Sequence, residues 1–275
     1  MPEKYQILLT NDDGIQSPGL WAAAEALSTL GYVTVVAPRE QSSGTGRSMP
    51  LTSDGIIRKL TMRVHQQEWT VYSVGGTPAQ AVQHAIFEIM PVRPDLVVSG
   101  INYGENVGLG VTISGTVGAA MEAASFGIPA LAVSLQTDEA YYLSYSKEIQ
   151  FETAGIFTAR FAGMALAVGC FPPDVDLLKI DLPAGATPDT PWEITRQSRS
   201  RYYETVKPNR QTWEEPGLMD IRLDVNVQEP EGTDIHAMAK KRVVSVTPIS
   251  LDLTSRIDPG ELDEFLRTAK GSEER

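Results

Sequence analysis

The sequence predicts an α/β protein with a Rossmann-like, mostly parallel sheet flanked by helices, followed by a β-rich C-terminal extension or arm. Short apolar runs alternate with helical patterns along the first part of the 275-residue chain. Two such runs, Tyr5–Thr10 and Tyr32–Ala37, enclose a helical pattern. Strand, helix and strand within about thirty residues form one βαβ unit, whose strands pair in parallel.

Turn residues and periodicity predict the other elements of this first part. Ser17 and Pro18 favour a helix start, and Gly31 favours its end. The β-rich residues 56–74 indicate two strands, expected as a hairpin outside the main sheet. Further along we expect a helix at 77–90, a strand at 95–100, a glycine-rich loop at 103–116, a helix at 117–126, a strand at 130–135, a helix at 147–168 and a strand at 177–182.

The tail of the chain has a different composition. Prolines and glycines are frequent between residues 183 and 232, and the strand candidates WEITRQ, DIRLDVNV and RVVSVTPI are separated from one another. We therefore expect a Rossmann-like core at residues 1–186 and an extension at residues 187–275. The extension would contain an oligomerisation arm and a final helix at 259–270.

The composition argues against several classes of protein. The chain has 23 Lys and Arg against 35 Asp and Glu, a formal charge of −12, which disfavours a nucleic-acid polymer or an anionic membrane as a partner. The single cysteine, Cys170, excludes an intramolecular disulfide, and its apolar surroundings indicate a core residue. The N-terminal residues lack a signal pattern, and their apolar run is too short to span a bilayer, so we expect a cytoplasmic protein.

Oxygen-bearing side chains follow the expected strands at the sheet edge where α/β proteins bind ligands. The segments at this edge are Asn11-Asp12-Asp13-Gly14, Ser42-Ser43-Gly44, Ser99-Gly100-Ile101-Asn102 and Ser114-Gly115-Thr116. None of them contains histidine or cysteine, and hard oxygen ligands suit Mg²⁺ or Mn²⁺ better than zinc. The sequence therefore predicts a site for one divalent cation of this kind.

The adjacent carboxylates Asp12 and Asp13 are the sharpest of these signals. Their charges repel each other at the end of a strand, and a divalent cation between them would relieve the repulsion. The alternative is that one aspartate caps the following helix while the other faces water. Ser17 already provides a cap for that helix, which favours the metal site.

Two further segments are candidates for binding phosphate. Ser114, Gly115 and Thr116 precede a helix, and helix N-termini bind phosphate through free N–H groups. Ordinary N-capping by Ser114 or Thr116 is the alternative. The second candidate segment is Ser42-Ser43-Gly44, and its alternative role is that of an ordinary surface loop. Asn102 likewise has an alternative role as a turn residue.

The chain closely resembles the SurE survival-protein family in several motifs. These are TNDDGI at 10–15, APREQSSGTGRS at 37–48, PDLVVSGINYGENVG at 94–108, ISGTVGAAMEA at 113–123, GTDIHA at 232–237 and VSVTPI at 244–249. The resemblance implies a phosphoric monoester hydrolase, a 5′/3′-nucleotidase acting on nucleoside monophosphates with a divalent metal. It also implies a Rossmann-like core and a C-terminal arm exchanged between the subunits of a homodimer or homotetramer.

The resemblance also implies roles for individual residues. The family's metal ligands correspond to Asp12, Asp13, Ser43 and Asn102, and its phosphate loop corresponds to Ser114, Gly115 and Thr116. We hypothesise that the bound cation contacts a phosphate oxygen and activates a water for attack. Asp12 or Asp13 would be the catalytic base, while Asn11 and the phosphate loop would bind the phosphate oxygens.

Some segments depart from the resemblance or leave alternatives open. LKIDLP at 178–183 stands where the family often has an LNVNVP-like pattern, and KPNRQTWEEP at 207–216 replaces an aspartate-proline-arginine-glycine sequence. Asp234 and His236 are compatible with a general acid for the leaving ribose oxygen and with an anchor for the arm. The anchor is the preferred interpretation.

Two other functions compete with the hydrolase. An aspartate-nucleophile phosphatase of the haloacid dehalogenase type needs a second acid two residues after the first, but here the acids are adjacent and position 14 is glycine. A phospho-signalling receiver module also binds Mg²⁺ through paired acids. It needs a phospho-acceptor aspartate at the end of a central strand, where this chain has Ser99-Gly100-Ile101-Asn102.

Overall fold

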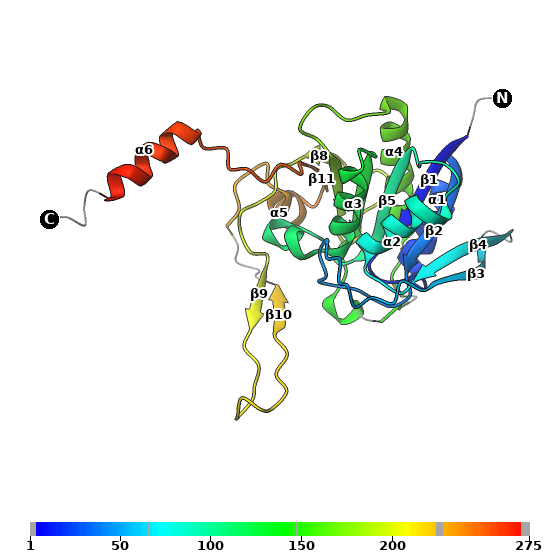
Figure 1. Cartoon of the computed structure of the whole chain (residues 1–275), viewed down its shortest axis with the longest axis horizontal. Helices are drawn as coiled ribbons and strands as arrows, with labels where there is room; N and C mark the ends of the chain where they lie inside the picture. Colours follow the sequence, from blue (N-terminus) through cyan, green and yellow to red (C-terminus); the bar gives the residue numbers. More distant parts are fainter. Residues whose placement is uncertain (1–3, 65–66, 143, 147, 224–227, 271–275) are drawn as a thin grey trace.

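A nine-stranded sheet organises the part of the chain that the computed structural model describes, residues 4–64, 67–142, 144–146, 148–223 and 228–270 (Figure 1). The strands are β1 Tyr5–Thr10, β2 Gly31–Pro38, β3 Ile57–Val64, β4 Gln67–Val74, β5 Leu96–Tyr103, β6 Ala130–Leu135, β7 Leu177–Leu182, β8 Trp192–Ile194, β9 Tyr203–Val206, β10 Asp220–Leu223 and β11 Val244–Ile249. The α-helices are α1 Pro18–Leu27, α2 Pro78–His84, α3 Gly115–Ser125, α4 Glu152–Val168, α5 Asp234–His236 and α6 Pro259–Lys270. The predicted fold class is confirmed.

The strand order changes direction at β1. The order is β3-β4-β2-β1-β5-β6-β7-β11-β8, and β1 pairs in parallel with both β2 and β5. The chain therefore winds outward from β1 in both directions. In such sheets ligands bind outside the carboxyl ends of the strands where the winding reverses. The residues after β1 and those at the end of β5 lie at this point.

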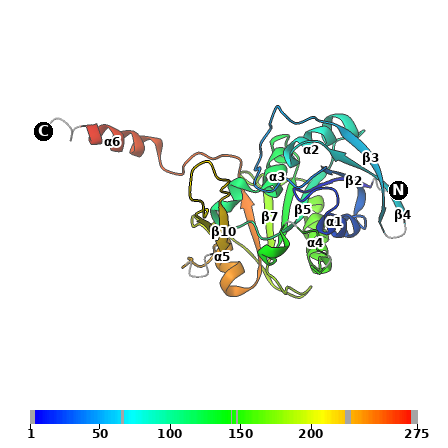
Figure 2. The same cartoon turned by 90° about the horizontal axis from the view of Figure 1, so that it is seen from below.

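Helices cover both faces of the sheet (Figure 2). Leu20 of α1 and Phe157 of α4 belong to one buried cluster, and Val82 of α2 and Ala120 of α3 belong to another on the opposite face. Strands β5 and β6 are buried along their whole length. This two-sided burial explains why their sequences are continuous apolar runs without alternation.

The sequence located most elements well, with differences at their ends. The bounds of β6 and β7 and of the final helix agree with the prediction. The helix expected at 77–90 is α-helical only to His84, and a π-helical turn continues it over Ala85–Ile89. Its start is a capping box formed by Thr77 and Gln80. Ser17 precedes α1, but its side chain makes no capping hydrogen bond.

Three observations correct or refine the expectations. The β3–β4 hairpin is not outside the main sheet, because β4 pairs in parallel with β2 and the hairpin forms an edge. Cys170 is exposed just after α4 rather than buried. In the tail, β11 pairs antiparallel with β7, and β8 pairs in parallel with β11. The division into residues 1–186 and 187–275 stays a prediction, and strands of the second part complete the sheet of the first.

The arm formed by β9 and β10 and the helix α6 both extend away from the sheet (Figure 1). Leu262, Phe265 and Leu266 on α6 are exposed. No helix within the described ranges combines the length and apolar character needed to cross a membrane. The role of the arm in oligomerisation stays a prediction.

Phe157→Ala should lower the free energy of unfolding by about 3–5 kcal/mol, because it leaves a cavity in the core between α4 and the sheet. Met164→Ala on the same helix is the matched control. Its residue is 47% exposed, so the expected change is within about 0.5 kcal/mol. Denaturant unfolding followed by circular dichroism measures both. A loss below about 1 kcal/mol in the Phe157 variant would contradict the packing of α4.

Candidate functional site

Asp12 and Asp13 lie just beyond β1, and each is hydrogen bonded to a different neighbouring segment. The two residues are 4% and 1% exposed. The hydroxyl of Thr116, in the first turn of α3, donates to Asp12 Oδ1. The backbone N–H of Tyr103, at the end of β5, donates to Asp13 Oδ2 at 3.2 Å. The pair therefore joins β1, β5 and α3, and neither aspartate faces bulk water.

Burial raises the pKa of Asp12 to about 6. The Thr116 hydroxyl and the backbone N–H groups of Asp12, Thr116 and Gly115 oppose this effect, because they favour the charged carboxylate. Gly115 permits the close approach. A Cβ at this position would lie 2.7 Å from Asp12 Cβ and 2.8 Å from Asp12 Oδ2. The absence of a side chain at Gly115 thus lets Asp12 reach the N-terminus of α3.

The pKa of Asp13 is raised well above its usual range, first by burial and then by the charge of Asp12 beside it. The Tyr103 N–H and the Gln41 amide lower this pKa only in part. Among the residues that the structure describes, no Lys or Arg side chain contributes to the pKa of either acid. Two adjacent buried acids therefore lack a positive partner from the described chain, and a divalent cation would supply that charge.

Gln41, which sequence reasoning missed, connects the acids to the loop after β2. Its Nε2 donates to Asp13 Oδ1 at 3.3 Å, to Ser43 Oγ at 3.1 Å and to the Tyr142 carbonyl at 2.6 Å. Ser43 Oγ is therefore held close to Asp13, as a shared metal site requires. The available signal was a polar side chain two residues before a predicted ligand.

The side chains of Asn102 and Asn11 shape the backbone of the site. Asn102 Nδ2 donates to the carbonyls of Tyr103 at 3.0 Å and Gly104 at 2.7 Å. Asn102 Oδ1 accepts no hydrogen bond from the residues that the structure describes, so this oxygen is free to act as a ligand. Asn11 closes a turn with Gly14 through bonds of 3.1 and 3.2 Å, and both ends of its amide are thereby engaged. The loop that carries the two acids is fixed by this turn.

The predicted phosphate-binding residues at the start of α3 are largely engaged through their side chains. Ser114 Oγ accepts the Val117 N–H at 3.1 Å, so Ser114 is the N-cap of α3. The hydroxyl hydrogen of Thr116 is directed to Asp12. The backbone N–H groups of Gly115 and Thr116 act on the Asp12 carboxylate, so the Ser114 O–H is the group at this helix start that remains for a phosphate.

The loop at residues 42–47 lies directly against α3. The Gly46 N–H donates to the Ile113 carbonyl at 2.9 Å. A Cβ at Gly118 would lie 2.3 Å from the Gly46 carbonyl oxygen, so only glycine fits there. Gly44 is exposed, with φ of +73°, and a Cβ there would meet nothing within 4 Å. Gly44 therefore allows the loop to turn rather than to pack.

The donor atoms of the predicted ligands fit a hard divalent cation. Asp12, Asp13, Ser43 and Asn102 offer two carboxylates, a hydroxyl and an amide oxygen. Within the ranges described, no three or more His, Cys, Asp or Glu side chains form a group that could hold a metal. Neutral oxygens must therefore complete the coordination of any ion at the acids, which favours Mg²⁺ or Mn²⁺ over zinc.

Tyrosines and Glu105 enclose the site beyond β5. The ring of Tyr142 covers Gly104, where a Cβ would lie 2.6 Å from the ring. The hydroxyls of Tyr142 and Tyr203 are 2.9 Å apart. Glu105 is buried close enough to raise the pKa of Tyr203 after the larger effect of burial. A charged residue within the glycine-rich segment was the signal in the sequence for Glu105.

Asp234 and His236 do not form a hydrogen-bonded pair in the described structure. Asp234 is fully buried, accepts the Gly108 N–H at 3.1 Å and the Ser198 N–H at 2.8 Å, and pairs with Lys179. The buried Nδ1 of His236 has no partner among the described residues. These contacts give Asp234 an anchoring role and provide no orienting carboxylate for His236.

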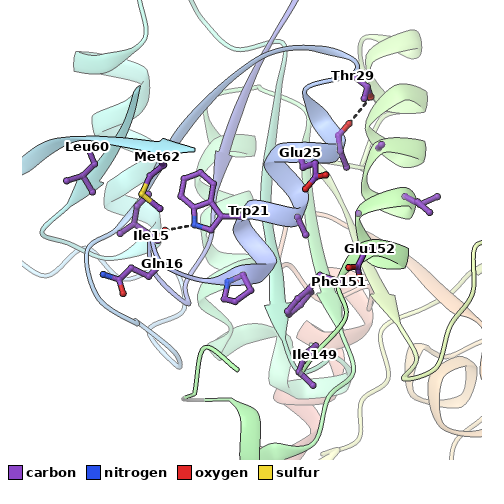
Figure 3. A pocket seen from close by; sticks show the side chains of 16 residues that line it. Ile15, Gln16, Trp21, Glu25, Thr29, Leu60, Met62, Ile149, Phe151 and Glu152 are labelled. Carbon is purple, nitrogen blue, oxygen red and sulfur yellow. Dashed lines mark hydrogen bonds between the residues drawn. The ribbon is translucent and has the colours of Figure 1, made fainter. Parts of the chain in front are cut away.

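A groove of about 1050 Å³ lies between α1, α4 and β3, next to the polar site but not part of it (Figure 3). Trp21 and Met62 contribute to its apolar wall, and the Trp21 indole N–H donates to the Ile15 carbonyl at 3.0 Å. Its charged lining residues are Glu25 and Glu152. Because these carboxylates repel anions and none of its described lining residues is Lys or Arg, the groove is unsuited to a phosphate.

Asp12→Asn should change the pH dependence of stability in the metal-free protein. The folded-state pKa of about 6 exceeds the ordinary value of 3.8, so Asp12 stabilises the fold below about pH 4 and loses this contribution as the pH rises through about 6. The difference is on the order of 2–3 kcal/mol, and asparagine lacks it. Denaturant unfolding with a chelator, between about pH 4 and 7, measures both proteins. Equal pH slopes for the two would contradict this assignment.

The comparisons with known proteins agree with this fold and these motifs. The sequence model of the family described as "Survival protein SurE" matches residues 7–204. The chain is 41% identical over 267 residues to the 5′-nucleotidase SurE of Methanocella arvoryzae, covering 96% of this chain and 98% of that protein. It is 44% identical over 266 residues to the 5′-nucleotidase SurE of Methanosarcina mazei, covering 95% and 97%. The crystal structure of the SurE protein from Aquifex aeolicus superposes with a TM-score of 0.72 at 32% identity and covers 96% of this chain and 99% of that one. The chain therefore belongs to the survival protein SurE family.

Proposed function

We propose that the chain is a divalent-metal-dependent phosphomonoesterase that hydrolyses nucleoside 5′- and 3′-monophosphates to nucleoside and phosphate. The observation that carries the proposal is the buried Asp12–Asp13 pair beside the N-terminus of α3, with raised pKa values and no cationic side chain of the described residues acting on it. The names of the relatives, 5′-nucleotidase SurE, support a nucleotide as the substrate.

Asp12, Asp13, Ser43 and Asn102 would hold one Mg²⁺ or Mn²⁺ ion per subunit. Such an ion, when bound, supplies positive charge to the phosphoryl oxygens and lowers the pKa of a water. One carboxylate of the pair, Asp12 or Asp13, accepts the proton of the attacking water. Gln41 and Tyr103 orient Asp13, while Thr116 orients Asp12.

The start of α3 would bind the phosphate. Its Ser114 O–H donates to a phosphate oxygen, aided by the positive end of the helix dipole. Gly115 leaves room for the Asp12 side chain beside this position, and the loop with Gly44 faces the same region. Asn11 supports the acids through its turn with Gly14 rather than through a free side chain.

The proposal includes assembly through the arm and a cytoplasmic location. The segment joining β9 and β10 exposes Trp213 and Leu218, with exposed fractions of 86% and 92%. Apolar side chains of this size are normally covered, and a second copy of the chain would cover them in a homodimer or homotetramer.

Asp12→Asn and Asp13→Asn should each lower phosphate release by about a hundredfold or more. Each removes a negative charge that would hold the cation, and the cation stabilises the phosphoryl transition state. A phosphate-release assay over 5′- and 3′-mononucleotides with Mg²⁺ or Mn²⁺, repeated with a chelator, measures substrate class and metal need together. Asp252→Asn, at an exposed position, is the control. Near wild-type turnover in both site variants, or turnover unaffected by chelator, would rule out the proposed site.

Gly115→Ala should reduce phosphate release by about ten- to a hundredfold, because the added Cβ displaces Asp12 from the start of α3. The matched control is Gly110→Ala in the preceding 3-10 helix Gly108–Ile113, where a Cβ would meet nothing within 4 Å. The same assay applies to both proteins. Equal losses in the two variants would mean that the segment is merely intolerant of alanine.

A further inference from the structure

Buried carboxylates hold the segment that connects the two halves of the site. Residues 104–107 link Asn102 in β5 to the 3-10 helix Gly108–Ile113, which leads into α3. The Asn106 N–H donates to Asp181 Oδ1 at 2.7 Å, and the Gly108 N–H donates to Asp234 Oδ2 at 3.1 Å. One carboxylate thus holds each end of a three-residue stretch.

Lys179 joins these two carboxylates. Its Nζ lies 2.5 Å from Asp181 Oδ2 and 3.3 Å from Asp234 Oδ2, and all three side chains are 0% exposed. Burial alone would lower the pKa of Lys179, but the two carboxylates outweigh it, and the pKa is raised. The lysine is therefore charged, as a buried ion pair of this kind requires.

The cluster also draws together distant parts of the fold. Lys179 and Asp181 lie in β7, whereas Asp234 begins α5 in the tail. Asn106 Nδ2 donates to Ser134 Oγ in β6 at 2.9 Å. Gly108 has φ of +58°, and a Cβ there would lie 2.6 Å from the Ser200 carbonyl oxygen. Residues 106–108 are therefore held in place by contacts with the sheet on one side and with the tail on the other.

We propose that Lys179 is a positioning residue for the loop between Asn102 and α3. By holding Asp181 and Asp234 in place, it sets the orientation of the peptides at Asn106 and Gly108, and through them the placement of Asn102 Oδ1 and the first turn of α3. Its catalytic consequence rests on the proposed function, whereas the ordering of the loop does not. Lys179 and Asp181 belong to the LKIDLP segment, which departs from the family resemblance.

Lys179→Met tests this role, because it leaves two buried carboxylates without their cation. Hydrogen exchange followed by mass spectrometry should show exchange about tenfold faster in residues 104–114. The value of kcat/KM for a mononucleotide with Mn²⁺, per folded molecule, should fall at least about tenfold. Mn²⁺ titration should show weaker binding. Thr158→Val is the matched control, since Thr158 is buried in α4 and its hydroxyl donates to the Ala154 carbonyl, away from Lys179 and the loop.

A second pair of variants decides the matter if Lys179→Met does not fold. Asn at position 181 keeps an oxygen that can accept the Asn106 N–H, whereas Ala does not. Asp181→Asn should therefore show hydrogen exchange at residues 104–114 close to that of the wild type. Asp181→Ala should show faster exchange in the same residues.

The outcomes separate positioning from stability alone. A lower melting temperature in Lys179→Met with wild-type exchange at 104–114 and wild-type kcat/KM would overturn the proposal, as would equal exchange in the two Asp181 variants. If the wild-type protein releases no phosphate from any monoester, the proposed function fails, and the exchange data still decide whether Lys179 orders the loop.

Discussion

Two neighbouring carboxylates buried at the end of β1 constrain the structure around them. Burial raises the pKa of both, and the charge of Asp12 raises that of Asp13 further. The fold opposes this with dipoles: the first turn of α3 faces Asp12, and the N–H of Tyr103 faces Asp13. Dipoles supply only part of a charge. The two carboxylates therefore keep an electrostatic repulsion that a hard cation would relieve.

A second pair of buried acids receives a cation from the chain itself, although burial still raises the pKa of Asp181 to about 6. Asp181 and Asp234 share Lys179, and the pKa of this lysine is raised despite its burial. For Asp12 and Asp13, no Lys or Arg in the described ranges contributes to either pKa. Asp12 and Asp13 accept hydrogen bonds from α3 and from the end of β5, whereas Asp181 and Asp234 accept them from the segment between β5 and α3. The contrast separates a structural pair, which carries its own cation, from a pair suited to an external one.

The sequence predicted the features that depend on neighbouring residues, such as the position of a strand, but not those that depend on distant ones. Continuous apolar runs located β6 and β7, because strands buried on both faces need no alternation. The edge hairpin β3–β4 and the tail strands β8 and β11 were placed wrongly or not at all, because periodicity identifies a strand but not its partner. Lys179 shows the same limit. The sequence reveals a charge in an apolar run, but its partner Asp234 lies far along the chain.

At the site, the motifs identified the residues that belong together but not the atoms that face a ligand. A hydroxyl has one hydrogen to donate, and Thr116 directs its hydrogen to Asp12. The backbone N–H of Thr116 also acts on the Asp12 carboxylate and lowers its pKa. Both ends of the Asn11 amide are likewise engaged with Gly14. Groups that a motif marks for the substrate can thus serve to hold the acids in place, and at the start of α3 the Ser114 O–H remains for the anion.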